Sequence, residues 1–174
     1  MKKFLLTAAI LFAGLSITKA QNNHARIGAH IGLPLDDFNT SHNFNFGVDF
    51  SYLWEVNDVL KLGGKTGMSH FTGNDYNYSM YSNNGTYQFY IKYEDLTIVP
   101  LAITTKWNFA GKFFTGGDLG YAFFLNGSEN TGALYVQPQV GINLGKNEIY
   151  LGYKGLVKDG EALASVNLGY AFNF

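Results

Sequence analysis

The sequence of 174 residues contains no cysteine, only three prolines and few charged residues, which make up 14% of the chain. The lack of cysteine excludes a disulfide framework and thiolate chemistry. After residue 20 no apolar run approaches the roughly 20 residues that a membrane helix needs, so any membrane crossing would have to be made by strands. The net charge of -1 is too small, and too mixed in sign along the chain, to indicate a nucleic acid partner.

The first 20 residues have the organisation of a secretory signal peptide. Lys2 and Lys3 precede an apolar run over residues 4–17, and the small-x-small site at residues 18–20 precedes Gln21. The apolar run is too short for a membrane anchor. We therefore predict a cleaved signal peptide over residues 1–20 and one domain over residues 21–174, whose net charge falls from -1 to -4 when the three lysines of the signal are removed.

The rest of the chain is rich in glycine and aromatic residues and alternates with a period of two. In the clearest run Phe44, Phe46 and Val48 alternate with Asn45, Gly47 and Asp49. Such alternation indicates strands with one apolar face. We predict eight strands and no substantial helix, and the strands cover residues 26–35, 43–56, 60–80, 87–109, 113–125, 134–144, 149–157 and 166–174.

The predicted connections alternate between short turns and longer polar loops. The Asn84-Gly85 dipeptide favours a two-residue turn that places Met80 opposite Phe89 and Leu62 opposite Trp107. The other short turns pair Trp54 with Leu60, Phe109 with Phe113, and Ile142 with Leu151, whereas residues 36–41, 126–132 and 158–161 are predicted loops. Short turns at one end and long loops at the other are typical of outer-membrane barrels.

Prolines fall inside two of these strands, and aromatic residues gather near the short turns. Pro100 and Pro138 each remove a ladder hydrogen bond, so we expect a bulge at one or both positions. Trp54 and Trp107 lie beside the predicted turns, where an interfacial aromatic girdle is expected.

Alternation alone is compatible with a soluble lipocalin-like barrel or with a membrane barrel whose apolar face points outward. The interior of an eight-stranded barrel is only just wide enough to be filled by side chains. The apolar face is far too bulky for that space, whereas the other face is rich in glycine, alanine, serine and asparagine. We therefore predict an all-β fold: an eight-stranded antiparallel up-and-down transmembrane β-barrel with a protruding hairpin formed by the third and fourth strands.

The residues at both ends of the domain carry a resemblance to a known family. The signal ending Ala20-Gln21, the alternating strands, the segment at residues 98–101 (Ile-Val-Pro-Leu) and the C-terminal pattern Tyr170-x-Phe172-x-Phe174 resemble the small outer-membrane β-barrel family, similar to the OmpX, Ail and opacity-protein group. The resemblance implies a barrel in the outer membrane of a Gram-negative cell, surrounded by lipid. It also implies that Tyr170, Phe172 and Phe174 are the signal for the barrel-assembly machinery, and no catalytic residue or cofactor carries over.

The face opposite the apolar one carries a set of charged residues. The predicted registers place Asp49 opposite Lys65, Lys65 opposite Thr104, and Thr104 opposite Asp118. Charges in a narrow lumen are costly unless they are paired, so we predict a plugging, fold-specifying network, with an ion pathway as the alternative. Its members are Arg26, Asp49, Glu55, Lys61, Lys65, Lys106, Asp118 and Lys154.

The third and fourth strands are longer than a bilayer requires. A crossing takes about 9 to 11 residues, so these strands continue roughly 10 residues further and could place their tip about 30 Å from the membrane. Exposed aromatic strands can bind a surface partner or host protein, whereas a hairpin folded back over the barrel would cover them. The predicted contact residues are Tyr76, Tyr78, Met80, Tyr87, Phe89 and Tyr93.

Catalytic and metal sites have little support in the sequence. His70 and Thr72 resemble the His-x-Ser motif of membrane lipid A deacylases, but threonine replaces serine and the pattern places no carboxylate beside them. His24, His30, His42 and His70 share no ligand spacing. We predict a non-enzymatic barrel with a structural or surface-contact role and no metal or cofactor, and the alternatives are a small passive pore and a lipid A-modifying enzyme.

Overall fold

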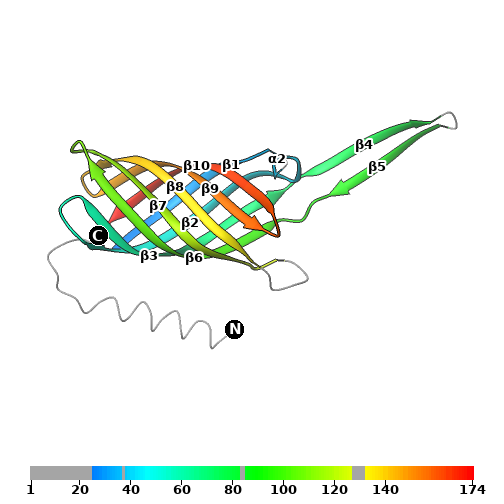
Figure 1. Ribbon diagram of the computed structural model, residues 1–174. Helices are drawn as coiled ribbons and strands as arrows, with labels where there is room; N and C mark the ends of the chain where they lie inside the picture. The colour runs from blue at the N-terminus through cyan, green and yellow to red at the C-terminus, as the bar shows by residue number, and fades with distance from the viewer. Residues whose placement is uncertain (1–24, 37, 83–84, 127–131) are drawn as a thin grey trace, which may run out of the picture.

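The computed structural model describes residues 25–36, 38–82, 85–126 and 132–174, so the predicted signal peptide lies outside the described residues. Eight strands form a closed barrel in the order β1-β10-β9-β8-β7-β6-β3-β2, and β4 and β5 form a separate two-stranded sheet (Figure 1). Every neighbouring pair is antiparallel, and the pairing of β1 with β10 closes the cylinder. The predicted eight-stranded antiparallel barrel is confirmed.

The strand bounds follow the predicted segments, except that the third and fourth predicted strands are each divided in two. The elements are β1 (Ala25–Leu35), α2 (Phe38–Ser41), β2 (His42–Glu55), β3 (Leu60–Gly73), β4 (Asp75–Ser82), β5 (Gly85–Lys92), β6 (Leu96–Phe109), β7 (Phe113–Phe124), β8 (Gly132–Leu144), β9 (Asn147–Lys158) and β10 (Glu161–Asn173). Within the described part of the chain, no helix has the length and apolar character needed to cross a bilayer.

The outer surface of the barrel carries the large apolar side chains. Ile31, Leu101 and Leu168 are exposed, whereas Asp49 and Lys65 are buried inside the cylinder. Because side chains alternate across a strand, one face of each strand points toward lipid and the other lines the lumen. The prediction that the apolar face points outward is confirmed, and the soluble alternative, with that face inside, is wrong.

The lumen is filled in layers along the barrel axis. At the loop end, an apolar cluster contains Phe38, Phe71, Ile98, Ala102, Ala122, Ala133, Tyr135 and Leu156. At the turn end, a second buried cluster contains Phe114, Tyr150 and Ala171. Charged and polar side chains lie between these clusters and also near the turn end. The interior is therefore a packed core in which apolar layers and charged or polar layers alternate along the barrel axis.

A short helix in the first loop was not predicted. Helix α2 places Phe38, which is only 3% exposed, in the apolar cluster at the loop end. Its ring centroid lies 5.1 Å from that of Phe71 on β3. A segment that the sequence indicates only as a polar loop thus supplies part of the core, because the open mouth of the barrel provides an apolar surface for Phe38 to bury.

The register of the longest strand pair differs from the prediction. Trp107 pairs with Leu60 instead of Leu62, and Met80 pairs with Tyr87 instead of Phe89. The connection therefore falls on residues 83–84, outside the described residues, and Gly85 is the first residue of β5 with a φ of 132°. The predicted turn was wrong because one register runs through both ladders, so many cross-strand pairs outweigh the preference of a single dipeptide.

Two other predicted registers are also displaced by two residues. Trp54 pairs with Leu62 because the connection after β2 is longer than predicted, with the Asn57 side chain accepting hydrogen bonds from the N–H groups of Val59 and Leu60. Ile142 pairs with Ile149 because Gly145, with a φ of 70°, starts the turn one residue earlier. A displacement of two leaves the faces unchanged, since the side-chain period is two. The predicted pairing of Phe109 with Phe113 is confirmed.

The remaining connections and the prolines also depart from expectation. The predicted loop at residues 158–161 is a two-residue turn in which Asp159 and Gly160 have φ values of 52° and 88°, as in a hairpin of type I′. The expectation of a bulge at Pro100 or Pro138 was wrong, because the strand register is the same on both sides of each proline. In the described ladders the register shift lies instead near His42, at the start of β2.

Candidate functional site

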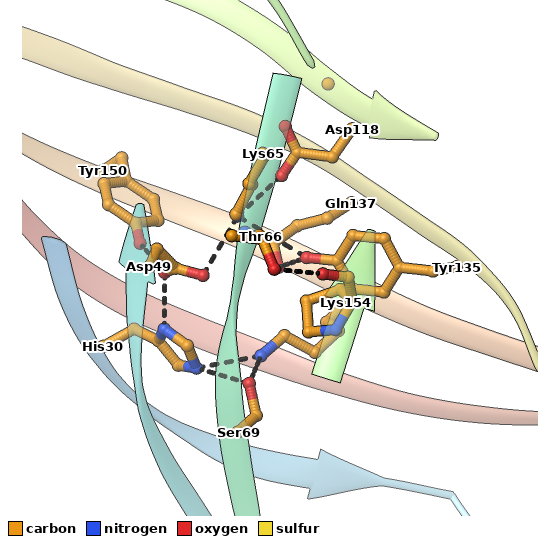
Figure 2. Close-up of polar contacts among 12 residues, drawn as sticks. His30, Asp49, Lys65, Thr66, Ser69, Asp118, Tyr135, Gln137, Tyr150 and Lys154 are labelled. Carbon is orange, nitrogen blue, oxygen red and sulfur yellow. Dashed lines mark hydrogen bonds and ion pairs between the residues drawn. The ribbon is translucent and has the colours of Figure 1, made fainter. Parts of the chain in front are cut away.

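The centre of the lumen holds an ion-pair cluster built from strands on several sides of the barrel. Lys65 on β3 donates a hydrogen bond to Asp118 Oδ2 at 2.7 Å, and its Nζ lies 3.3 Å from Asp49 Oδ1 (Figure 2). In the ladders Lys65 pairs with Ser51 and Ala102, so the predicted pairings of Lys65 with Asp49 and with Thr104 were both wrong. The length of the lysine side chain nevertheless brings the three charges together. Thr104 does pair with Asp118, as predicted.

Asp49 also connects this ion pair to a second lysine through His30. His30 Nδ1 donates to Asp49 Oδ2 at 2.7 Å, and Lys154 Nζ donates to His30 Nε2 at 2.9 Å and to Ser69 Oγ at 2.7 Å (Figure 2). These partners assign the proton of a neutral imidazole to Nδ1. With His30 neutral, two carboxylates balance two ammonium groups, as a buried charge cluster requires.

Tyrosine side chains complete the cluster on both sides. Tyr150 donates its hydroxyl to Asp49 Oδ2 at 3.0 Å, and Tyr135 donates its hydroxyl to Gln137 Oε1 at 2.7 Å. Glycine makes room for these bulky groups, since a Cβ at position 169 would lie 2.1 Å from Tyr150 Cζ. The small residues of the inward face are thus required by the large residues packed against them.

The contacts of Asp49, His30 and Ser69 have the connectivity of a catalytic triad. His30 Nε2 lies 3.0 Å from Ser69 Oγ, and its Nδ1 faces the carboxylate. A triad histidine must accept the serine proton at Nε2. Here the Lys154 ammonium group donates to that nitrogen and to Ser69 Oγ, and all four side chains are buried. Lys154 therefore occupies the nitrogen at which a triad histidine accepts the serine proton.

A second charged layer lies near the turn end. Glu148 on β9 forms ion pairs with both Arg26, at 2.9 Å from Nε to Oε2, and Lys106. Lys106 also donates to Asn143 Oδ1 at 2.6 Å. One carboxylate thus holds two cations from opposite sides of the lumen.

The eight predicted network residues fall into three groups. Asp49, Lys65, Asp118 and Lys154 form the central cluster, and Arg26 and Lys106 belong to the layer near the turn end. The Glu55 and Lys61 side chains form a 2.8 Å ion pair at the solvent-accessible rim, so they do not belong to the buried network.

Several residues of the network were not singled out from the sequence. They are His30, Ser69, Tyr135, Gln137, Glu148 and Tyr150. The alternation along each strand does place these positions on the inward face, so the sequence could show that their side chains point into the lumen. It could not show which inward residues touch, because that depends on strands that are distant in sequence.

The second histidine considered, His70, lies on the outer face near the loop end. Its Nδ1 is 2.9 Å from Thr97 Oγ1, and its Nε2 is 3.6 Å from Asp95 Oδ2, which is too far for a hydrogen bond. Asp95 uses its other oxygen to accept the Gly73 N–H at 2.9 Å. Thr72 is not a partner of His70 in these contacts. Over the described residues, no group of three or more potential metal ligands is found.

The β4–β5 hairpin extends away from the barrel as a continuation of β3 and β6 (Figure 1). Its base is tied to the first loop, since Asn74 N–H donates to the Ser41 carbonyl at 2.8 Å. Met80 and Phe89 are about half exposed, as are Tyr90 and Ile91, and Tyr93 is half-buried at the base. The backbones of the other predicted contact residues belong to the two strands, but the side chains of Tyr76, Tyr78 and Tyr87 lie outside the described part.

The C-terminal aromatic residues lie at the turn end of β10. Tyr170 and Phe174 are exposed on the outer face, and the rings of Phe172 and Phe174 make an edge contact with centroids 5.2 Å apart. Trp54, Trp107, Phe109 and Phe113 are exposed near the same end. Aromatic side chains at this level suit the boundary between hydrocarbon and headgroups.

These features together define a class of protein. A closed eight-stranded antiparallel cylinder with an apolar exterior, a packed charged interior and an aromatic band near its short turns is a transmembrane β-barrel of the outer-membrane type.

Comparison with solved structures gives the same fold. Ail of Yersinia pestis in a phospholipid bilayer nanodisc superposes with a TM-score of 0.56 at 14% sequence identity, covering 88% of this chain and 100% of Ail. The crystal structure of Ail with the heparin analogue sucrose octasulfate has a TM-score of 0.53 at 15% identity, covering 87% and 97% of the two chains. A de novo designed transmembrane β-barrel has a TM-score of 0.51 at 11% identity, covering 90% and 100%.

No protein-family model matches the sequence, and a search of curated proteins finds no significant match. The likeness to Ail and to the designed barrel therefore concerns the fold, which is the eight-stranded membrane barrel that the sequence resembles.

Proposed function

We propose that this protein is a non-enzymatic barrel of the outer membrane that acts at the cell surface through its β4–β5 hairpin. The observation that carries the proposal is the hairpin itself, which leaves the barrel as a separate sheet and exposes Met80, Phe89, Tyr90 and Ile91. Exposed apolar patches on a soluble surface usually mark an interaction site. The expected partner is a surface component or a host protein.

The contents of the lumen favour this role over that of a passive pore. An ion crossing the barrel would have to displace Phe38 and Phe71 and then separate the pairs that Lys65 makes with Asp49 and Asp118. Breaking buried ion pairs is costly, and conduction requires sites that bind ions only weakly. We therefore assign the network a structural role, holding the eight strands in one arrangement.

The polar geometry gives little support to a lipid-modifying enzyme. Lys154 donates a hydrogen bond to His30 Nε2, whereas the outward His70 contacts the hydroxyl of Thr97 and lies 3.6 Å from the Asp95 carboxylate. A nucleophile, a base and an orienting group must converge for acyl transfer.

The location and biogenesis follow from the same proposal. Residues 1–20 direct export and are removed, lipid surrounds the barrel, and Tyr170, Phe172 and Phe174 engage the barrel-assembly machinery. Ail, which has the same fold, was crystallised with a heparin analogue, so this fold is compatible with binding of a surface ligand.

Replacement of residues 75–92 by a short turn tests the surface role. Because β3 and β6 complete the barrel without β4 and β5, the shortened protein should fold and keep the heat-dependent gel mobility of a barrel. Adhesion of intact cells to an epithelial cell layer should fall to the level of cells lacking the protein. Unchanged adhesion contradicts the proposal.

Protease treatment of intact cells provides the matching topology test. Cleavage near residues 83–84 of the full-length protein is expected, and a protected tip contradicts the proposed exposure. A planar-bilayer recording of the purified protein should show no stable conductance, and steady ion currents would favour the pore instead.

A further inference from the structure

A depression in the lipid-facing wall lies at the turn end of β3, β6 and β7, at the opposite end of the barrel from the β4–β5 hairpin (Figure 1). It has a volume of about 690 Å³, and Thr105, Trp107, Thr115 and Gly117 are among the residues that line it. A smaller depression of about 250 Å³ shares Thr115 and continues across β8, β9 and β10. The wall is therefore hollowed on this side, where it meets the aromatic band.

The strand register explains why the wall is hollow here. Thr105, Gly117 and Pro138 are consecutive partners on β6, β7 and β8, and their side chains are short or absent. The next outward pair toward the loop end is Ile103 with Leu119, and both of these larger side chains are exposed beside the hollow. Because all five residues belong to the hydrogen-bonded ladders, the depression has a fixed shape.

The hydroxyl groups in the floor of the depression are used within the wall itself. Thr105 donates to the Gly117 carbonyl at 3.3 Å, and Thr115 donates to the Gln139 carbonyl at 3.2 Å. A polar group in hydrocarbon needs such a partner. With each hydroxyl turned to the backbone, the threonines present their methyl groups. The floor therefore suits an apolar occupant and not a headgroup or a sugar.

The turn-end margin of the depression has a different character. The Trp107 ring is exposed there, and Asn57, in the connection between β2 and β3, also lines the depression. An indole N–H and a carboxamide NH₂ are hydrogen-bond donors, and tryptophan is typical of the level at which acyl chains meet headgroups. The margin therefore matches the ester and phosphate oxygens of a lipid, whereas the floor matches its chain.

The depth of the depression fits one leaflet. Gly117 lies four residues along β7 from Phe113, which pairs with Phe109 in the aromatic band. Four residues rise about 14 Å along a strand, which is about 10 Å along the membrane normal at a tilt of roughly 45°. Half of the hydrocarbon core is about 15 Å deep. The depression thus follows an acyl chain from its ester end through most of one leaflet.

We propose that the depression is a binding site for one phospholipid of the leaflet at the turn end. One acyl chain fills the hollow, and the glycerol esters lie beside Trp107 and Asn57. Within a bilayer, close packing drives association, since lipid and wall are equally apolar. Atoms around a void lack dispersion partners, so a chain in the hollow gains contacts that a convex part of the wall does not offer. This lipid is therefore held longer than the lipids around the rest of the barrel.

A photoreactive lipid tests the site in the membrane. The protein is reconstituted in vesicles of phosphatidylcholine that contain a small fraction of phosphatidylcholine with a diazirine in one acyl chain. After illumination, the labelled residues are mapped by mass spectrometry. Label should be several-fold denser on residues 105–117 than on β1, whose outward positions include Ala29. Label spread evenly around the barrel overturns the proposal.

Filling the hollow provides the matched comparison. Gly117→Leu adds bulk where a Cβ meets no atom closer than 3.7 Å, so the barrel should form, and labelling of residues 105–117 should fall to the level of the rest of the wall. Ala29→Leu adds bulk to an exposed, outward position of β1, four strands away around the barrel from β7, and should leave the labelling unchanged. Gel mobility before and after heating verifies barrel formation in both variants.

The outcomes separate the lipid site from the surface role of the hairpin. Equal labelling of residues 105–117 in wild type and Gly117→Leu overturns the site, and so do protein–protein cross-links there in place of lipid. The inference requires lipid around the barrel, so label at no outward position would overturn the membrane location along with the site. Protection of the hairpin tip from protease on intact cells would overturn the surface role and leave the lipid site standing.

Discussion

Replacement of Asp49 by alanine should destabilise the barrel strongly. The carboxylate accepts hydrogen bonds from His30 and Tyr150 and pairs with Lys65, and the residue is 5% exposed. The variant leaves two lysines facing only Asp118, with the His30 N–H and the Tyr150 hydroxyl unpartnered. Breaking a buried ion pair by removing one partner costs about 3–5 kcal/mol.

Asp75→Ala is the matched control for this prediction. Asp75 is exposed on the hairpin outside the barrel, where loss of one carboxylate should change stability by no more than about 0.5 kcal/mol. Both variants remove one negative charge, so any difference between them reports the environment of the charge.

Urea-induced unfolding in lipid vesicles, followed by tryptophan fluorescence, measures the difference. With an m-value of about 2 kcal/mol/M, a loss of about 4 kcal/mol lowers the midpoint by about 2 M. Asp49→Asn should lie between alanine and wild type, since the amide oxygen keeps one acceptor but removes the charge. Equal midpoints for Asp49→Ala and Asp75→Ala would refute the reasoning that the lumen charges hold the barrel together.

Three further predictions concern the packing and the chemistry of the barrel. Gly169→Ala should destabilise the barrel by about 1–3 kcal/mol and so lower the urea midpoint, because the added Cβ would lie 2.1 Å from the Tyr150 ring. Gly64→Ala is the control and should leave the midpoint unchanged, since a Cβ there has no atom within 4 Å. Phe38→Ala should cost about 3 kcal/mol in the same assay without producing conductance in planar bilayers, because the central ion pairs remain. His70→Ala should leave the lipid A mass spectrum of expressing cells identical to that of wild type, and a change specific to the intact protein would favour an enzyme.

The charged cluster occupies the part of the lumen between the two buried apolar clusters. Most of the large apolar side chains lie on the lipid-facing surface, so this central layer is assembled from lysine, aspartate, histidine and tyrosine. Such a cluster is favourable only when every charge finds a partner, and removal of one member affects all the others. The narrow lumen and the glycines that line it make those contacts specific.

The sequence alone determined which side chains face lipid and which face the lumen. Leu101 and Lys65 lie on the predicted sides although their cross-strand partners are displaced by two residues, because an even displacement leaves every face unchanged. The total volume of the apolar side chains then showed that their face points outward, since these side chains could not fit inside a barrel of eight strands. The number of barrel strands and their up-and-down order therefore follow from the sequence pattern, and the outward direction of the apolar face follows from side-chain volume.

Only the tertiary structure decided which inward residues meet. His30, Ser69 and Lys154 come from β1, β3 and β9, and their contact depends on the closure of the barrel and on the stagger between strands, which no local pattern encodes. The burial of Phe38 likewise requires the finished mouth of the barrel. Local alternation is a property of one strand, whereas a contact across the lumen is a property of the closed cylinder.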